Sequence, residues 1–409
     1  GDIRPFDKDF YLPESLDLLP EVLKNYGYAT AGFVAGGHLK SVFGFADGFD
    51  IYEDEYDFGS LFYTAPMAME WLELNRDKPF FLFLHGYDCH SNYAKPHLFH
   101  HMYDSEYTGV AEEIIRDGFG IERVYKQKYF FEAQRTFVED RYGRRVLGED
   151  FFQEILPSLY ESEGPSIDVT PRDMEHIIAH YDSSMAYGDM WVGLVMSTLL
   201  RLQLDQNTMV VVFSDHGESL GDYDYMHHRP VLRDKIIHVP LVVYAPFDTD
   251  THGKTVDEVV ETIDILPTVL QYLGARPPDG ISGRSLVSRI RESNDEDRMQ
   301  LAFSESRSQA SVRSRYGQLV FEKSWLKEGE NRALDQLYGF PIDGRVFSYF
   351  AFEPSGEESA NEMDAHAVRL QKKLLDWLRN RKPVQVMGEF EGMEALDDLK
   401  VVLQEKGYW

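Results

Sequence analysis

The 409 residues include 41 Lys plus Arg and 70 Asp plus Glu, which gives a formal net charge of −29 at pH 7. This charge argues against a nucleic-acid or anionic-membrane binder, because such proteins need a basic surface. Hydrophobic residues make up 43% of the chain and aromatic residues 14%, which excludes a disordered acidic chain and leaves one large α/β domain with an appendage, or two or three domains.

The first part of the chain alternates helix and strand patterns. Residues 14–30 carry apolar side chains at helical spacing, stop at Gly27 and lead into a strand pattern. Residues 65–76 predict a second helix, and residues 80–84 a short buried strand. Such alternation is typical of a mostly parallel sheet that is covered by helices on both faces.

Residues 98–170 are charged and rich in Tyr and Phe, and they show no clear strand pattern. We predict helical hairpins inserted after the strand at 80–84, which either wall a pocket or form a solvated excursion. Residues 172–203 give the clearest helix pattern, with apolar residues repeating every three or four positions. Strands are then expected over 209–213 and 239–244, and a helix over 259–273.

The pattern changes again from about residue 300. Short strands are predicted over 301–304, 318–322 and 345–349, followed by a helix over 365–379. This indicates a small α+β subdomain with an antiparallel sheet. We therefore predict an α/β domain over residues 1–299, with the insertion at about 98–170, and a C-terminal subdomain over residues 300–409.

Asp215 and His216 come directly after the strand predicted at 209–213. Ligands of open α/β sheets bind at the carboxyl ends of the strands, so this position is a candidate site. A carboxylate next to an imidazole, with Gly217 permitting a tight turn, suits a divalent metal. The carboxylate favours hard ions, and the imidazole widens the choice to manganese or zinc. The alternative is a turn in which Asp215 caps the next segment and His216 is structural.

Two further histidine clusters lie near predicted strands, one in Asp88-Cys89-His90 and one at His227-His228. A lone loop histidine is more often solvated or structural than catalytic, but in a parallel sheet all three clusters would converge. Together they describe a pocket for the transfer of an anionic group such as sulfate or phosphate. A metal would offset the charge on the non-bridging oxygens, and a histidine would protonate the leaving oxygen.

The stretch from residue 181 to residue 246 resembles the core signature of the sulfatase family, within the alkaline-phosphatase superfamily. Supporting similarities cover residues 19–39, 44–52, 79–96, 262–286 and 348–363. The resemblance implies an alkaline-phosphatase-like α/β fold, a mostly parallel sheet sandwiched by helices. It also implies hydrolysis of sulfate esters, or of related phosphate or phosphonate esters, at one divalent metal ion, with Ca²⁺ expected first and Mn²⁺ or Mg²⁺ as alternatives.

The resemblance also assigns roles to individual residues. Asp215 and His216 match the second pair of metal ligands of the family, and many relatives have Asn in place of His216. His90 matches the histidine of the Asp-Pro-His loop, which contacts the anionic group and can serve the leaving oxygen. His228, twelve residues before Pro240, matches a His or Lys that contacts the same oxygens. His90 and His228 are therefore the predicted catalytic and substrate-binding residues, and His227 is a spare or simply exposed.

The sequence departs from the family pattern in the Asp-Pro-His-x-Pro loop, where Cys89 and Asn92 replace both prolines. Residues 34–38 also lack the lysine of the usual Gly-Lys-Trp-His. The family nucleophile, a Cys or Ser converted to formylglycine in Cys/Ser-x-Pro-x-Arg, is absent, and so is the first acidic pair of metal ligands. We expect both in a segment before residue 14 that this chain, which starts at Gly1, lacks, and we expect the chain alone to be inactive.

Cys89 is the only cysteine, which excludes an intrachain disulfide and a multi-cysteine zinc site. Its neighbours lack the Pro and Arg of the modification sequence, so we interpret it as a small loop residue rather than a nucleophile. The longest apolar runs are far shorter than the roughly 18 residues of a membrane span, so we predict none. The chain shows no signal peptide, and the compartment (cytoplasm, periplasm or outside) stays open together with the oligomeric state.

Three functions stay open from the sequence. The first is a sulfatase-type hydrolase, the second a phosphate or phosphonate ester hydrolase or phosphoglycerol transferase of the same superfamily, and the third a non-catalytic relative that binds or serves a structural role. The expected partner is a small sulfate or phosphate ester, because the charge of −29 disfavours polyanions. The identity of the substrate is not readable from these residues.

Overall fold

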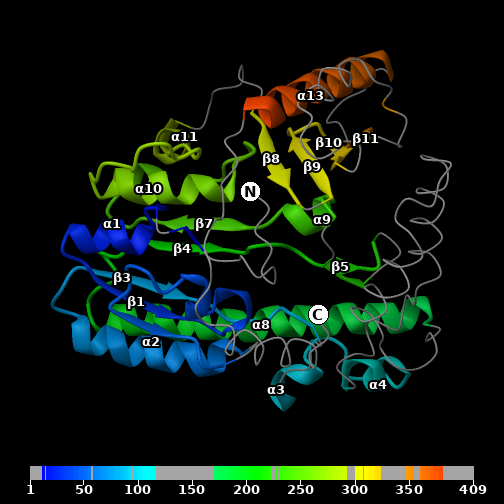
Figure 1. Ribbon diagram of the computed structural model, residues 1–409. Coiled ribbons are helices and arrows are strands. Elements are labelled where there is room, and N and C mark those ends of the chain that lie inside the picture. Colours follow the sequence, from blue (N-terminus) through cyan, green and yellow to red (C-terminus); the bar gives the residue numbers. More distant parts are fainter. Residues whose placement is uncertain are drawn as a thin grey trace. The chain divides into compact units, whose positions relative to one another are not determined.

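Figure 1 shows the computed structural model of the chain. The structure describes residues 12–13, 15–56, 59–91, 93, 96–116, 169–222, 226–228, 231–292, 300–306, 308–323, 342, 347–352 and 360–380. The chain divides into two compact units. Unit 1 comprises Gly1–Ile3, Met209–Glu218 and His228–Val384, and unit 2 comprises Arg4–Thr208, Ser219–His227 and Gln385–Trp409. The boundary predicted near residue 300 stays a prediction.

Unit 2 contains a three-stranded parallel sheet in the order β2-β1-β3, formed by β1 (Ala29–Phe33), β2 (Ile51–Glu53) and β3 (Phe80–Leu84). The strands alternate along the chain with α1 (Leu19–Asn25) and α2 (Leu61–Asn75), and α2 packs on β1 and β3. The structure therefore confirms the predicted alternation of helix and strand. A Cβ at Gly32 would lie 2.5 Å from the Tyr52 ring, so the glycine allows the ring to cover β1.

The helix predicted at 172–203 is α8 (Pro171–Arg201), which packs on α2. It begins with a capping box: Thr170 N–H donates to Asp173 Oδ2 at 2.7 Å, and Asp173 N–H donates to Thr170 Oγ at 3.2 Å. Pro171 occupies the first helical position, where its missing N–H has no cost. Local sequence therefore fixes where this helix starts.

The part of the predicted insertion that the structure describes forms α3 (His97–His100) and α4 (Ala111–Arg116), both packed on α8. Ile114 and Ile115 of α4 share a buried cluster with Ile177 of α8. Unit 2 also holds a short antiparallel pair, β5 (Ser219–Leu220) and β6 (Met226–His227). The rest of the predicted hairpins, residues 117–168, lies outside the described residues.

Arg172, in the first turn of α8, makes a bidentate ion pair with Asp104, at 2.6 and 2.7 Å. Hydrogen bonds from Arg172 lower the pKa of the Asp104 carboxyl from 3.8 to about 2. At pH values between these two pKa values, the unfolded chain binds more protons than the folded one. The contribution of Asp104 to stability is therefore complete above about pH 4 and lost as the pH falls through about 2.

We expect Asp104→Asn to remove this part of the acid dependence, because asparagine does not titrate. The measurement is the free energy of unfolding by urea at about pH 5 and about pH 3, with Asp17→Asn as a control at an exposed position. The wild type and the control should lose more stability between the two pH values than Asp104→Asn. An equal loss in all three proteins would contradict the assignment.

Unit 1 contains an antiparallel strand pair, β4 (Val210–Phe213) and β7 (Leu241–Tyr244), in which Phe213 lies opposite Leu241. Both strands match the predicted positions. They pair in antiparallel fashion, whereas the convergence of the three histidine clusters was expected for a parallel sheet. The antiparallel direction puts the carboxyl end of β4 beside the amino end of β7. Residues that follow β4 and residues that precede β7 therefore lie at the same edge of this pair.

The C-terminal part of unit 1 is a four-stranded antiparallel sheet in the order β11-β10-β9-β8. Its strands are β8 (Ala302–Glu305), β9 (Gln309–Arg313), β10 (Gly317–Glu322) and β11 (Phe347–Ala351), and α13 (Ala360–Asn380) packs on them. A buried cluster joins Val312, Leu319 and Phe321 of the sheet to Leu370 and Leu374 of the helix. The structure confirms the three predicted strands and the helix, and it adds β9.

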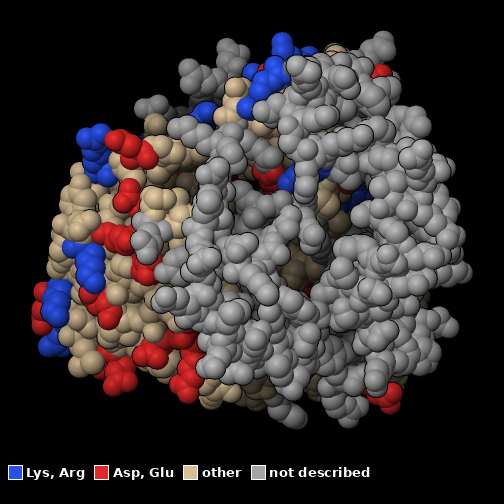
Figure 2. All heavy atoms as spheres, viewed as in Figure 1, with Lys and Arg blue, Asp and Glu red and all other residues tan. Residues whose placement is uncertain are grey.

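The remaining elements of unit 1 are α9 (Asp234–Ile237), α10 (Ile265–Tyr272), α11 (Val287–Glu292), η4 (Thr249–Thr251) and η5 (Thr262–Asp264); unit 2 also has η1 (Gly37–Leu39) and η2 (Ser41–Phe43). On the described part of the face in Figure 2, acidic side chains lie interspersed with basic ones. Among the helices that the structure describes, none combines the length and the apolar content needed to cross a bilayer.

Candidate active site

The loop after β4 contains Asp215, His216, Gly217 and Glu218, and it is held against α9. Gly217 N–H donates to the carbonyl of Ile236 at 2.7 Å. A Cβ at Gly217 would lie 2.1 Å from the carbonyl oxygen of Lys235, so no other residue fits without a backbone shift. Close backbone approach therefore fixes the positions of the two side chains before this glycine and the one after it.

Gly217→Ala is expected to lower the free energy of unfolding by about 1–3 kcal/mol, because the backbone carbonyl of Lys235 must move to make room. Activity should fall with it, since the loop carries the candidate ligands. The measurement is urea unfolding. The control is Gly193→Ala in α8, where an added Cβ meets nothing within 4 Å. A Gly217→Ala protein as stable as the control would contradict the close approach.

Asp215 and His216 present two metal-binding atoms to each other. His216 Nδ1 lies 3.0 Å from the carbonyl oxygen of Gly217. Because a carbonyl only accepts hydrogen bonds, Nδ1 carries a proton, and in the neutral ring Nε2 has the lone pair. Asp215 Oδ1 accepts from His216 N–H at 2.9 Å, and its Oδ2 lies 3.6 Å from His216 Nε2. One hard and one borderline donor atom thus face the same point, which fits a divalent cation.

His228 lies directly against His216, with the ring centroids 4.0 Å apart. Its Nδ1 is 2.9 Å from Glu218 Oε1, and the Glu218 side chain is only 6% exposed. The carboxylate accepts a hydrogen bond from Nδ1–H and thereby fixes the tautomer and the orientation of the ring. The structure therefore brings together three predicted residues, Asp215, His216 and His228, within unit 1.

Glu218 is the residue that sequence reasoning missed at this site. Its position directly after Gly217 assigns it no partner and no role. Its partner, His228, is ten residues away. No local periodicity connects two loop residues at this distance, and only the acidic character of Glu218 and the imidazole of His228 hinted at a pair.

His90 lies in unit 2, in the loop after β3. Its backbone N–H donates to Tyr87 at 3.0 Å, and its Nδ1 is 2.9 Å from the carbonyl of Ser91, which leaves Nε2 as the acceptor. The buried Asp88 accepts from Ser60 Oγ at 2.6 Å and from Leu61 N–H at 2.7 Å, at the start of α2. Asp88 thus holds a loop that lacks both prolines.

The remaining predicted residues take the following places. Cys89 is exposed in the His90 loop. His227 belongs to β6. The convergence of His90 with Asp215, His216 and His228 stays a prediction, as do the catalytic and metal-binding roles of all four.

Solved structures share this fold. A phosphonate monoester hydrolase from Silicibacter pomeroyi superposes with a TM-score of 0.61 at 17% identity, over 93% of this chain and 83% of that one. A structure in complex with its substrate D-glucosamine-2-N,6-O-disulfate superposes with a TM-score of 0.58 at 15% identity, over 97% and 85%. The class of fold is therefore the alkaline-phosphatase-like α/β fold, as predicted.

The family model described as Sulfatase matches residues 4–275, and the chain belongs to the sulfatase family. An ulvan-active sulfatase from Formosa agariphila is 34% identical over 126 residues, 31% of this chain and 24% of that protein. The multifunctional alkaline phosphatase superfamily protein PehA from Trinickia caryophylli is 24% identical over 238 residues, 58% and 42%. Arylsulfatase K from Homo sapiens is 34% identical over 118 residues, 29% and 22%. The chain thus matches less than half of the length of each of these relatives.

Proposed function

We propose that the protein is a metal-dependent hydrolase of small sulfate esters, with Asp215 and His216 as two of the metal ligands. The observation that carries the proposal is the approach of Asp215 Oδ2 and His216 Nε2 beside the His228–Glu218 pair. We expect Ca²⁺, with Mn²⁺ or Mg²⁺ as alternatives, and the imidazole ligand widens the choice toward borderline metals. When bound, the cation would offset negative charge on the non-bridging oxygens of the ester.

The proposed role of His228 is to protonate the leaving oxygen. Glu218 accepts a hydrogen bond from Nδ1–H of His228, so the ring presents Nε2 to the ester. When the ring is protonated, Nε2–H can donate a proton to the leaving oxygen. His90, whose Nδ1 faces the backbone carbonyl of Ser91, is proposed to contact the same anionic group. The neighbouring ring of His216 restricts the movement of His228.

The nucleophile is proposed to come from outside these 409 residues, as a formylglycine hydrate or a Ser or Thr of the complete protein. The Cys/Ser-x-Pro-x-Arg sequence does not occur in the chain. Cys89 is exposed and lies next to His90, but nothing around it marks it for modification. We therefore infer that Cys89→Ser leaves activity unchanged.

A second candidate function is the hydrolysis of phosphate or phosphonate esters. Two observations favour it: the phosphonate monoester hydrolase with the same fold, and the match to PehA over 58% of this chain. The same ligand pair and the same histidine serve either ester, because both expose anionic oxygens to a metal and release an alkoxide or phenoxide.

Parallel assays with 4-nitrophenyl sulfate, 4-nitrophenyl phosphate and a phenylphosphonate ester on the full-length protein separate these functions. We expect the highest kcat/KM with the sulfate. A clear preference for the phosphate or the phosphonate would replace the first proposal by the second. Metal binding at Asp215 without turnover of any ester would instead identify a non-catalytic relative.

A further inference from the structure

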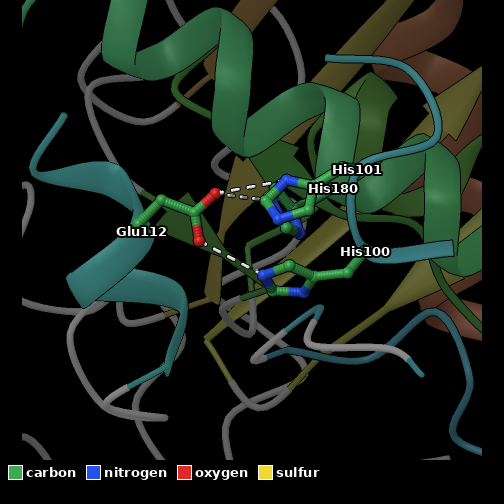
Figure 3. Close-up of side chains that lie close together, drawn as sticks. All are labelled: His100, His101, Glu112 and His180. Carbon is green, nitrogen blue, oxygen red and sulfur yellow. Dashed lines mark hydrogen bonds and ion pairs between the residues drawn. The ribbon is translucent and has the colours of Figure 1, made fainter. Parts of the chain in front are cut away.

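Unit 2 contains a second group of potential metal ligands, and none of them is among the predicted site residues. His100 ends α3, His101 follows it, Glu112 lies in α4 and His180 lies in α8. Figure 3 shows the three imidazole rings turned toward the Glu112 carboxylate. One ligand atom from each of the four side chains lies within 4.8 Å of the others. Three separate elements of the fold therefore contribute to one compact cluster.

Two of the three distances from these rings to Glu112 are longer than a hydrogen bond. His100 Nε2 is 3.2 Å from Glu112 Oε2, whereas His101 Nδ1 and His180 Nε2 are 3.5 and 3.9 Å from Oε1. The last two exceed the usual N–H···O range of about 2.7–3.2 Å. Ligands of a tetrahedral Zn²⁺ with bonds of about 2.0–2.2 Å lie about 3.3–3.6 Å apart.

The burial of one of these rings also suits a metal ligand. His180 is 1% exposed, and its Nδ1 has no hydrogen-bond partner among the described residues. The cluster therefore combines a buried imidazole with a carboxylate that three histidine rings approach.

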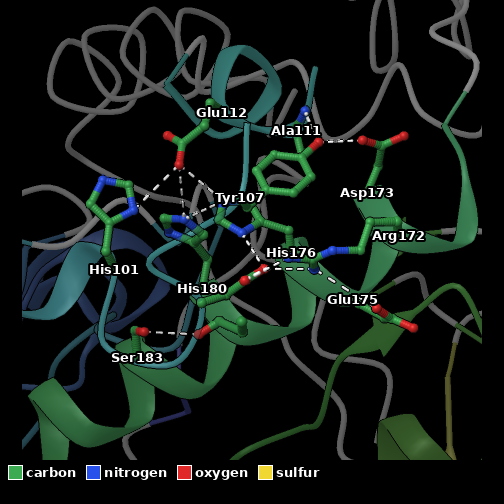
Figure 4. Close-up of polar contacts among 12 residues, drawn as sticks. His101, Tyr107, Ala111, Glu112, Arg172, Asp173, Glu175, His176, His180 and Ser183 are labelled. Atoms are coloured by element: carbon green, nitrogen blue, oxygen red, sulfur yellow. Dashed lines mark hydrogen bonds and ion pairs between the residues drawn. The ribbon is translucent and has the colours of Figure 1, made fainter. Parts of the chain in front are cut away.

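A second layer of side chains holds Glu112 in place (Figure 4). His176, one helical turn before His180, has Nε2 at 3.0 Å from Glu112 Oε1 and Nδ1 at 2.8 Å from Asp104. The ring of Tyr107 stacks on His176 at 3.8 Å, and its hydroxyl accepts from the N–H of Ala111, next to Glu112. Such a carboxylate–histidine support is typical of the outer shell of a metal site.

We propose that His100, His101, Glu112 and His180 bind one Zn²⁺ ion in a structural site that ties α3 and α4 to α8. Three imidazoles and a carboxylate are donors that zinc prefers, and four protein ligands leave no open coordination position. His176 lies 3.0 Å from His180 Nε2 as well as from Glu112, and its N–H donates to Glu112 when His180 binds the ion. The proposal uses residues of unit 2 alone and does not depend on the proposed function.

The test is titration of chelator-treated, full-length protein with Co²⁺, whose visible absorption reports tetrahedral coordination, followed by displacement with Zn²⁺. It is carried out in the Asp215→Asn background, which removes the carboxylate ligand of the other candidate metal site. We expect one tetrahedral equivalent in this background, one with Glu113→Gln, and none with Glu112→Gln. Glu113 is the matched control, because it is the next residue of α4 and is exposed. Equal Co²⁺ binding by Glu112→Gln and Glu113→Gln, or no tetrahedral Co²⁺ in either, would overturn the proposal.

Two further variants guard against a misfolded Glu112→Gln protein. The His101 side chain is 41% exposed, so His101→Gln should fold and still lose the tetrahedral absorption. His252→Gln, at an exposed position of unit 1, should retain it. Asp104→Asn should weaken Zn²⁺ binding by about 10–100-fold through the outer shell. Wild-type binding by His101→Gln would show that the cluster is only a hydrogen-bonded network.

Discussion

Asp215→Asn in the full-length protein is expected to lower the metal-dependent kcat/KM for an aryl sulfate by about 10³-fold or more. The carboxylate supplies Oδ2 next to His216 Nε2, and an amide oxygen has no net charge to offset that of a divalent cation. The loss should appear in both metal content and turnover. The measurement is steady-state kinetics together with elemental analysis of the purified protein.

The control for this prediction is Asp250→Asn, at an exposed position of the same unit. It should bind metal and turn over substrate like the wild type. His216→Gln should resemble Asp215→Asn, because Nε2 is the second donor atom at the same point. Unchanged metal content and unchanged activity in Asp215→Asn would rule out the assignment of the ligand pair.

The second large effect concerns proton transfer by His228. His228→Gln is expected to lower kcat by about 10²–10⁴-fold for esters with poor leaving groups, because no protonated imidazole would reach the leaving oxygen. Esters with acidic phenol leaving groups need less protonation and should lose much less. A series of aryl esters of increasing phenol pKa measures this difference. The same loss across the series would contradict a role as general acid.

Variants of Glu218 test whether this residue positions the His228 ring. It fixes the ring of His228 through Nδ1, so Glu218→Ala should lower kcat in the same leaving-group-dependent manner, but by less than His228→Gln. Glu218→Gln keeps an acceptor oxygen for Nδ1–H and should recover part of the activity. Equal kinetics of Glu218→Ala and Glu218→Gln would show that the pair serves packing rather than positioning.

Much of the fold was predictable because its signals are local. The start of α8 is encoded by Thr170, Pro171 and Asp173, and its body by apolar spacing. The direction of β7 was not predictable, because the partner of a strand is chosen by tertiary packing. β9 (Gln309–Arg313) was missed because its short alternation of small, polar and apolar residues resembles a loop, and its pairing with β8 and β10 supplies what the local sequence lacks.

The candidate site, too, was predictable only where its sequence signals are local. Asp215 and His216 could be found because they follow a buried strand and precede a glycine. The contact of Glu218 with His228 joins residues of two loops, and no sequence pattern encodes it. The cluster around Glu112 was missed for the same reason, since its ligands come from α3, α4 and α8. Only the spacing of His176 and His180, one turn apart on α8, hinted at a shared face.

The most direct test of the proposed function is the rate of aryl sulfate hydrolysis by the full-length protein before chelation, after chelation, and after addition of Ca²⁺ or Mn²⁺. We predict that chelation abolishes the activity, that one of the two ions restores it, and that Asp215→Asn is not restored at the same concentration. Hydrolysis that continues unchanged in the chelated protein, or restoration of Asp215→Asn to the wild-type rate, would contradict a metal-dependent site at Asp215 and His216.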